Sequence, residues 1–242
     1  MQAPPRAVTF DYWDTLYDGH VLPERVRFRQ DALLGMLVAL GRPLPWPEFE
    51  ALYLASGEEA ERWWREEHRG YHTRDRIRWI LAQLQIDRPD DCEHLQQAVT
   101  AVDAALLRWP APLLPGAAGL VRQAAARYRL AIVSDTGFAS GVAQDALLER
   151  DALRPHFDAT IYSMDLGHCK PRPEPFAAAV AALGVAPHEI VHVGDNEHTD
   201  VRGALDAGLR AIRVDFVRRN GPSAAEFVAQ TPDELAEYLT AL

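Results

Sequence analysis

The sequence predicts an α/β protein: a Rossmann-like parallel sheet core with helices on both faces, plus an all-α helical-bundle cap domain. Two observations predict this fold. From residue 117 onward, short apolar runs alternate with helical patterns, and an apolar run without polar alternation is typical of a buried parallel strand. Between the first apolar run and residue 110, by contrast, the patterns are helical throughout, over a stretch far longer than an ordinary connection.

Apolar runs define the expected strands of the core, at residues 7–10, 130–133, 159–162, 190–193 and 211–214, the third being the weakest. The helices expected after them cover 117–128, 141–153, 175–183 and 201–207, with a last helix that begins after Thr231. Pro175 and Gly184 are the start and stop signals of one helix, and Thr231 with Glu234 forms a capping box at the last. Alternating strands and helices favour a parallel sheet covered on both faces.

The long helical stretch is expected to be a cap domain inserted after the first strand. Its helices are expected near residues 23–41, 47–67, 73–86 and 90–108, where apolar residues recur at helical spacing. The proline-rich segment 110–116 is typical of a stiff return linker. The sequence therefore predicts a core segment at 1–17, a helical cap at 18–109 and the remaining core at 110–242.

Composition and charge exclude several classes of protein. Of 242 residues, 48% are hydrophobic and 25% are charged, which is typical of a globular chain. A net charge of -10 argues against nucleic-acid binding, and no apolar run reaches the length of a membrane span. The first residues do not resemble a secretion signal, and Cys92 and Cys169 fit no metal or disulfide pattern. We therefore expect a cytoplasmic protein with reduced thiols.

Polar or ionisable side chains follow four of the expected strands. The four loops are Asp11 to Thr15, Ser134 to Gly137, Gly167 to Pro171, and Gly194 to Asp200. Because ligand sites of open parallel sheets lie at the carboxyl ends of the strands, these loops predict one shared site.

The residue types in these loops indicate phosphoryl chemistry. Asp11, Asp195 and Asp200 would make an all-oxygen site, which suits Mg²⁺ rather than zinc. Ser134 and nearby backbone N–H groups can hold an oxyanion, and Asp11 is placed to act as a carboxylate nucleophile. Lys170 is the single lysine among 25 basic residues, and it offers a compact positive charge for a phosphate or a crowded carboxylate.

These four motifs, in this order, resemble those of the haloacid dehalogenase superfamily of hydrolases, in the branch with a helical cap inserted after the first motif. The resemblance implies attack by Asp11 on a phosphoryl group, with Ser134 and Lys170 as the other catalytic residues. It implies Mg²⁺ held by Asp11, the backbone carbonyl of Trp13, Asp195 and Asp200. The residues expected at the phosphate are Thr15, Ser134, Asp135, Thr136 and Lys170.

The chain departs from the phosphatase pattern at Trp13, where phosphatases of this superfamily carry the general-acid aspartate. An indole has one N–H donor and does not titrate near neutral pH, so Trp13 cannot replace that acid. The loss costs least when the leaving group is stable as an anion. Dehalogenase members carry tyrosine at this position, but they need no metal and favour Asn where this chain has Asp135.

Other polar groups are candidates for roles at the site. Asp14 and His198 are weaker candidates for the missing acid. His68, Arg69, Tyr71 and His72 cluster in the cap and could reach the site on closure. The simpler interpretations are turn, loop and surface positions. Trp63, Trp64 and Trp79 are expected in the cap core, and Arg25, Arg27 and Arg29 on a solvated helix face.

The sequence thus predicts a Mg²⁺-dependent phosphatase that acts on a small phosphorylated metabolite through an aspartyl-phosphate on Asp11. No nucleic-acid or membrane partner is expected, and the sequence specifies neither the substrate nor the oligomeric state. Two alternatives stay open: a hydrolase like the 2-haloacid dehalogenases, and a weakly catalytic or non-catalytic binding protein.

Overall fold

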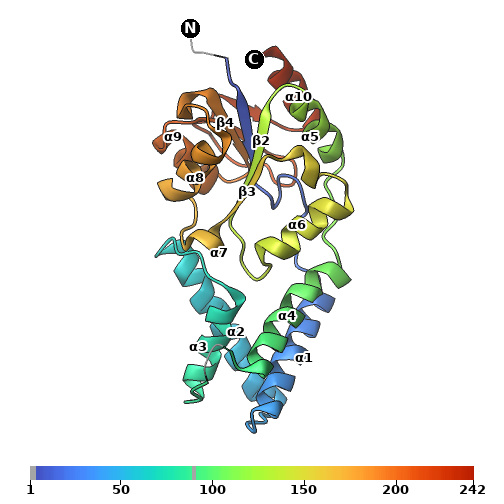
Figure 1. Cartoon of the computed structure of the whole chain (residues 1–242), viewed down its shortest axis with the longest axis vertical. Helices are drawn as coiled ribbons and strands as arrows, with labels where there is room; N and C mark the ends of the chain where they lie inside the picture. The colour runs from blue at the N-terminus through green and yellow to red at the C-terminus, as the bar shows by residue number, and fades with distance from the viewer. Residues whose placement is uncertain (1–3, 89–90) are drawn as a thin grey trace.

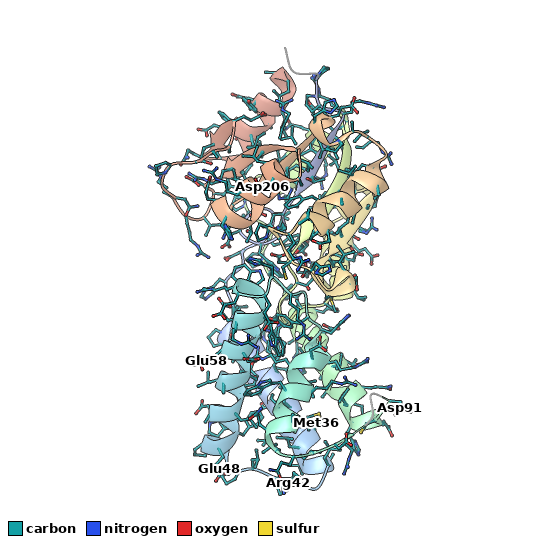
Figure 2. All side chains as sticks on the ribbon, turned by 90° about the vertical axis from the view of Figure 1, so that its left-hand side faces the viewer. Met36, Arg42, Glu48, Glu58, Asp91 and Asp206 are labelled. Atoms are coloured by element: carbon teal, nitrogen blue, oxygen red, sulfur yellow. The ribbon has the colours of Figure 1, made fainter. Side chains whose placement is uncertain are left out.

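A computed structural model describes residues 4–88 and 91–242. Residues 1–3 of the predicted core segment, and Asp90, with which the predicted helix at 90–108 begins, lie outside the described residues. Figure 1 shows two parts, a sheet with its helices and, below it, a bundle of helices. Figure 2 places Met36, Arg42 and Glu48 at the end of the bundle far from Asp206 in the sheet-containing part.

Over the described ranges, the core is a single six-stranded parallel sheet in the order β3-β2-β1-β4-β5-β6. Its strands are β1 (Ala7–Phe10), β2 (Arg129–Ser134), β3 (Ala159–Tyr162), β4 (Ile190–Gly194), β5 (Arg210–Val214) and β6 (Phe227–Ala229). The five expected strands are all present, whereas the short strand β6 was not expected from the sequence. The predicted α/β fold is therefore confirmed.

Helices cover both faces of the sheet because alternate strand residues face opposite ways. Val8, Phe10 and Ile132 pack with α5 and α6, whereas Ala131 and Val133 pack with α8. The helices of the core are α5 (Ala117–Ala125), α6 (Gly141–Arg150), α7 (Ser163–Leu166), α8 (Pro173–Leu183), α9 (Gly203–Asp206) and α10 (Pro232–Ala241). Short turns η1 (Arg154–His156), η2 (Pro187–Glu189) and η3 (Glu197–Arg202, π-helical) connect them.

The helices inserted after β1 form a bundle with an apolar core of its own. They are α1 (Pro23–Ala39), α2 (Trp46–Arg65), α3 (Thr73–Gln83) and α4 (Glu93–Arg108). Leu33, Phe49, Ile77 and Leu95 from these helices are buried together. We call this bundle the cap.

The chain enters and leaves the cap along two adjacent segments. Asp18 N donates to Pro112 O at 3.0 Å, and Leu114 N donates to Leu16 O at 2.8 Å. The entering and returning segments are thus hydrogen-bonded to each other beneath the cap.

Two further observations concern surfaces. In the described ranges no helix combines the length and apolarity that crossing a bilayer requires. The expectation of a solvated face at Arg25, Arg27 and Arg29 is wrong for two of the three. Arg27 is exposed, but Arg25 and Arg29 are 3% and 6% exposed. A spacing of four residues places them on the helix face that also carries Leu33 and Leu37.

Candidate active site

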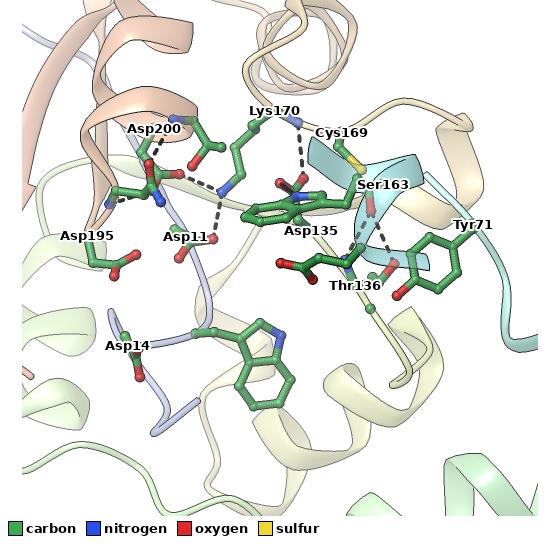
Figure 3. Close-up of a pocket in the computed structure, with 16 residues that line it drawn as sticks. Asp11, Asp14, Tyr71, Asp135, Thr136, Ser163, Cys169, Lys170, Asp195 and Asp200 are labelled. Carbon is green, nitrogen blue, oxygen red and sulfur yellow. Dashed lines mark hydrogen bonds and ion pairs between the residues drawn. The ribbon is translucent and has the colours of Figure 1, made fainter. Parts of the chain in front are cut away.

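The carboxyl ends of β1, β2 and β4 converge on one cavity of about 240 Å³. Figure 3 shows its lining residues, with Asp11, Asp195, Asp200 and Lys170 gathered on one side and Tyr71 on the other. Of the predicted site residues, seven line the cavity: Asp11, Trp13, Asp135, Thr136, Lys170, Asp195 and Asp200. The carboxyl ends of the parallel strands therefore bring together residues from loops that are far apart in the sequence.

Lys170 is the centre of the polar network. Its ammonium donates to Asp11 Oδ1 and Asp200 Oδ1, both at 2.6 Å, and to Val133 O at 2.9 Å. The residue is 2% exposed. Burial alone would lower the pKa of Lys170. The charges of Asp11 and Asp200 outweigh burial, so the pKa lies well above its usual range. Lys170 is therefore a fixed positive charge.

Three carboxylates face this single ammonium. Asp11, Asp195 and Asp200 each offer an oxygen, and these oxygens lie within 4.8 Å of one another; no other group of three potential metal ligands occurs in the described ranges. Burial, together with the charge of Asp200, raises the pKa of Asp195 to about 7. Burial also raises the pKa of Asp11. The charges of Asp200 and Asp195 add to this rise, and the charge of Lys170 opposes it. The excess negative charge and the oxygen donors fit a hard divalent cation such as Mg²⁺.

Asp200 is held from several directions. His192 Nε2 lies 3.2 Å from Asp200 Oδ1, and Asn196 N donates to Asp200 Oδ2 at 2.9 Å. Burial works against ionisation of Asp200, but Lys170 and His192 outweigh it and hold its pKa well below the usual range. Gly194 is required beside it, because a Cβ at that position would overlap the Asp200 side chain.

His192 is a buried partner that sequence reasoning missed. Burial lowers its pKa, which favours the neutral ring. Thr9 Oγ1 lies 2.9 Å from its Nδ1. Because Nε2 faces the Asp200 carboxylate, we assign the proton to Nε2, and the Thr9 hydroxyl then donates to Nδ1. The sequence did contain a signal: His192 is a polar residue within the otherwise apolar strand β4.

The residues expected at the phosphate fall into two groups. Asp135, Thr136 and Lys170 line the cavity. Ser134 and Thr15 are buried and are not among its lining residues. The Ser134 hydroxyl donates to Gln144 Oε1 at 2.9 Å, and the Thr15 hydroxyl donates to Asp11 Oδ2 at 3.3 Å. In this structure, both hydroxyls support neighbouring groups.

The cap closes directly over the cavity. Trp64, Glu61 and Tyr71 from the cap line it, and Trp64 Nε1 donates to Asp135 Oδ2 at 3.0 Å. The expectation that Trp64 belongs to the cap core alone is therefore wrong. Glu61 and Trp64 are three residues apart on α2, a spacing that places both on one helix face.

A turn of the cap, residues 68–72, lies against the core. His68 O accepts a hydrogen bond of 2.9 Å from Cys169 N. Gly70 approaches Ser163 so closely that a Cβ would overlap its carbonyl. Within the cluster named from the sequence, Tyr71 alone lines the cavity; Arg69 lies 3.8 Å from Asp75, and the backbone N–H of His72 donates to Asp75 Oδ2.

The two weaker candidates for the missing acid are placed differently. Asp14 lines the cavity, but its carboxylate accepts hydrogen bonds from Gly19 N at 2.8 Å and from Arg218 Nη2 at 2.7 Å. Both carboxylate oxygens of Asp14 are thus already engaged by groups of the protein. His198 is exposed, and its ring centroid lies 6.0 Å from that of His68.

A family profile matches most of the chain. The sequence profile described as haloacid dehalogenase-like hydrolase matches residues 5–208. The chain belongs to this family. The resemblance inferred from the motifs is thereby confirmed, and the chain is a member of a family of hydrolases.

Relatives within the family include phosphatases. The chain is 39% identical over 115 residues to phosphoserine phosphatase of Thermus thermophilus, a match that covers 47% of this chain and 45% of the relative. It is 29% identical over 243 residues to glyceraldehyde 3-phosphate phosphatase of Methanopyrus kandleri, covering 98% of each chain. The first match thus spans less than half of the relative's length.

Solved structures agree on the fold. A haloacid dehalogenase-family phosphatase from Thermococcus onnurineus superimposes with a TM-score of 0.69 at 22% identity, covering 97% of each chain. A 2-haloacid dehalogenase from Pseudomonas syringae also gives a TM-score of 0.69, at 25% identity, covering 98% of this chain and 99% of the other. The fold is therefore common to phosphatase and dehalogenase relatives, and it does not distinguish between the two activities.

Proposed function

We propose that this protein is a Mg²⁺-dependent phosphatase that hydrolyses a small phosphorylated metabolite through an aspartyl-phosphate on Asp11. The observation that carries the proposal is the contact of Lys170 Nζ with Asp11 and Asp200, both at 2.6 Å, beside a third carboxylate, Asp195. Two relatives are phosphatases of small phosphorylated molecules by name. The cytoplasmic location expected from the sequence stays a prediction.

Asp11, Asp195 and Asp200 would hold the metal, and the backbone carbonyl of Trp13, which lines the same cavity, is the expected fourth protein ligand. Bound Mg²⁺ offsets negative charge on the phosphoryl oxygens and favours the ionised form of the surrounding carboxylates. Lys170 contributes a second positive charge from the protein itself.

The proposed reaction has two steps. A carboxylate oxygen of Asp11 forms a bond to phosphorus, and the bond from phosphorus to the leaving oxygen breaks, with its electron pair going to that oxygen. Water then hydrolyses the aspartyl-phosphate, which releases inorganic phosphate and restores the carboxylate. Lys170 holds the Asp11 carboxylate in place during both steps.

Trp13 determines which leaving groups suit the site. Its indole cannot give a proton to the departing oxygen, and the neighbouring Asp14 is paired with Arg218. Leaving groups that are stable as anions, such as a phenolate or a carboxylate, need no such proton. We therefore expect aryl and acyl phosphates to react faster than alkyl phosphates.

Hydrolysis of 4-nitrophenyl phosphate, measured with Mg²⁺ and with chelator, tests the proposal. We expect turnover that needs Mg²⁺ and is abolished in Asp11→Asn. Asp165→Asn, at a carboxylate on α7 that is not among the cavity residues, is the matched control and keeps activity. Turnover in chelator, or in Asp11→Asn, would contradict the proposal.

A second candidate is dehalogenation of a 2-halo acid. The aromatic residue at Trp13 and the 25% identity to a 2-haloacid dehalogenase structure favour it, whereas the group of three carboxylates favours the phosphatase. Halide release from a 2-halo acid in the presence of chelator would establish the second candidate. Ligand binding without turnover of either substrate class would indicate a binding protein.

A further inference from the structure

A second cavity, of about 500 Å³, lies beside the candidate active site, between the cap and the core. The two cavities share lining residues: Trp13, Asp135, Thr136 and Gly137. The two cavities therefore adjoin along these residues, and a substrate with its phosphoryl group at Asp11 would have to pass Trp13 to reach the second cavity.

Three buried arginines line this second cavity. Arg25 and Arg29, from α1, are 3% and 6% exposed, and Arg76, from α3, is 8% exposed. Arg76 is held in place: its Nε donates to Ser56 Oγ at 2.9 Å, and its guanidinium lies 3.8 Å from the centroid of the Phe138 ring. Arg29 lies over the same ring at 5.3 Å. Arg29 and Arg76 thus lie around one ring, and Arg25 is one helical turn from Arg29 on the same face of α1.

Arg25 and Arg29 lack hydrogen-bond partners that buried cations require. Within the described ranges, Nε and Nη2 of Arg25 and Nε of Arg29 are buried with no hydrogen-bond partner. Burial lowers the pKa of each residue. Leaving such groups unpaired costs stability, so their presence beside a cavity indicates a site for an anion.

Neighbouring carboxylates of the described residues do not hydrogen-bond these nitrogen atoms. The charges of Asp18 and Asp103 act on Arg25 and Arg29, but the buried nitrogens named above stay without a hydrogen-bond partner. Asp135 lines the cavity, but its carboxylate already accepts hydrogen bonds from Lys170 N at 3.1 Å and Trp64 Nε1 at 3.0 Å. Arg27, on the opposite face of α1, shows the contrast: it is exposed and pairs with Asp31 at 3.0 Å. Burial without a partner therefore distinguishes Arg25 and Arg29 from an arginine on the same helix.

We propose that Arg25, Arg29 and Arg76 form an anion-binding subsite in the cap, which receives a carboxylate or a second phosphate of the substrate. The substrate class is then a phosphomonoester with a second anionic group at its far end. Leu54, Leu106 and Phe138 give the rest of the wall an apolar character that suits a short carbon skeleton. This inference rests on the proposed function for the placement of the phosphoryl end.

Three aryl phosphates test the substrate class: 4-carboxyphenyl phosphate, its neutral 4-carbamoyl analogue, and 1,4-phenylene bisphosphate. In the full chain with Mg²⁺, we expect either anionic compound to have a higher kcat/KM than the carbamoyl analogue. Arg25→Met and Arg29→Met should reduce that preference by about 10-fold or more, the usual effect of losing a charge-assisted hydrogen bond. Arg27→Met is the control and keeps the preference.

The two anionic compounds distinguish the sources of the anion. If the arginine variants reduce only the preference for the carboxyphenyl compound, the substrate class is a phosphorylated acid. If they reduce only the preference for the bisphosphate, the substrate class is a bisphosphate. An unchanged preference in both Arg25→Met and Arg29→Met would overturn the subsite.

A binding measurement keeps this test separate from the phosphatase activity. With chelator present, succinate should raise the melting temperature of the wild type and of Arg27→Met, but not that of Arg25→Met or Arg29→Met. Because an unpaired buried charge is removed, Arg25→Met without succinate should melt at or above the wild type. A succinate response that persists in both variants, or a lowered melting temperature without succinate in both, would contradict the subsite. If no phosphoester is hydrolysed, the phosphatase proposal fails while this binding result still stands on its own.

Discussion

Trp64 of the cap and Asp135 of the core are joined by a hydrogen bond of 3.0 Å from Nε1 to Oδ2. The contact joins the last turn of α2 in the cap to the loop after β2. It therefore couples the position of α2 to the residues at the candidate phosphate site.

Trp64→Phe tests the effect of the hydrogen bond separately from the effect of ring packing. It keeps an aromatic ring and removes the donor, and we expect kcat/KM to fall about 10-fold, since a hydrogen bond to a charged group contributes roughly 1.5–3 kcal/mol. Trp63→Phe is the matched control, because Trp63 Nε1 bonds Glu59 within the cap. Equal effects of the two substitutions on steady-state kinetics would argue against a role for the contact between cap and core.

Lys170→Arg should reduce kcat by about 10²-fold, because a larger planar cation displaces Asp11 from its position. Lys170→Met should lower the free energy of unfolding by about 3–5 kcal/mol at neutral pH, because it leaves buried carboxylates without their partner. Urea unfolding measures the second effect. The control is Arg172→Lys, at a partly buried residue outside the cavity that pairs with Glu174. Full activity of Lys170→Arg would show that the compact charge is not required.

Trp13→Asp should raise turnover of alkyl phosphates more than that of aryl phosphates, by about 10-fold or more if a general acid limits the rate. Trp13→Asn is the matched control, because asparagine has nearly the same size as aspartate and no titratable group. A similar gain in both variants would mean that removal of the ring enlarged the cavity, and that proton donation is not limiting.

The metal-free protein should lose stability as the pH rises from about 4 to about 7. Burial and Asp200 raise the pKa of Asp195 from 3.8 to about 7, so in this window the folded protein binds a proton that the unfolded chain releases. The raised pKa of Asp11 acts in the same direction.

Mg²⁺ competes with that proton, so it should raise the melting temperature more at pH 8 than at pH 5. Asp195→Asn should reduce the difference, and thermal unfolding with and without Mg²⁺ measures it. An equal response to Mg²⁺ at both pH values would count against Asp195 as a ligand.

Much of the fold could be predicted because its strands are buried on both faces. Such strands read as continuous apolar runs, and the loops after them carry Asp11, Lys170 and Asp195 in an order that restricts the site to one edge of the sheet. β6 was missed because three residues are too few for a periodic pattern. The limits of the cap at residues 18 and 109, and the roles of the site residues, stay predictions.

The error at two arginines of α1 has a physical cause that the sequence already contained. Arg25 and Arg29 were expected in solvent because they are charged, although their four-residue spacing continues to Leu33 and Leu37, on the buried face of α1. Side-chain direction, rather than residue type, decides the burial of these two arginines. Ser134 lies on the same face of β2 as Ile132 and donates to Gln144 of α6, and its expected role at the phosphate stays a prediction.

The single lysine of the chain has a practical consequence for spectroscopy. A sample labelled with ¹⁵N-lysine would give one side-chain ammonium signal, from Lys170 between Asp11 and Asp200. No assignment experiment or substitution of other lysines is needed. The chemical shift of that one signal would report on cation binding, on protonation of the carboxylates and on aspartyl-phosphate formation in the unaltered protein.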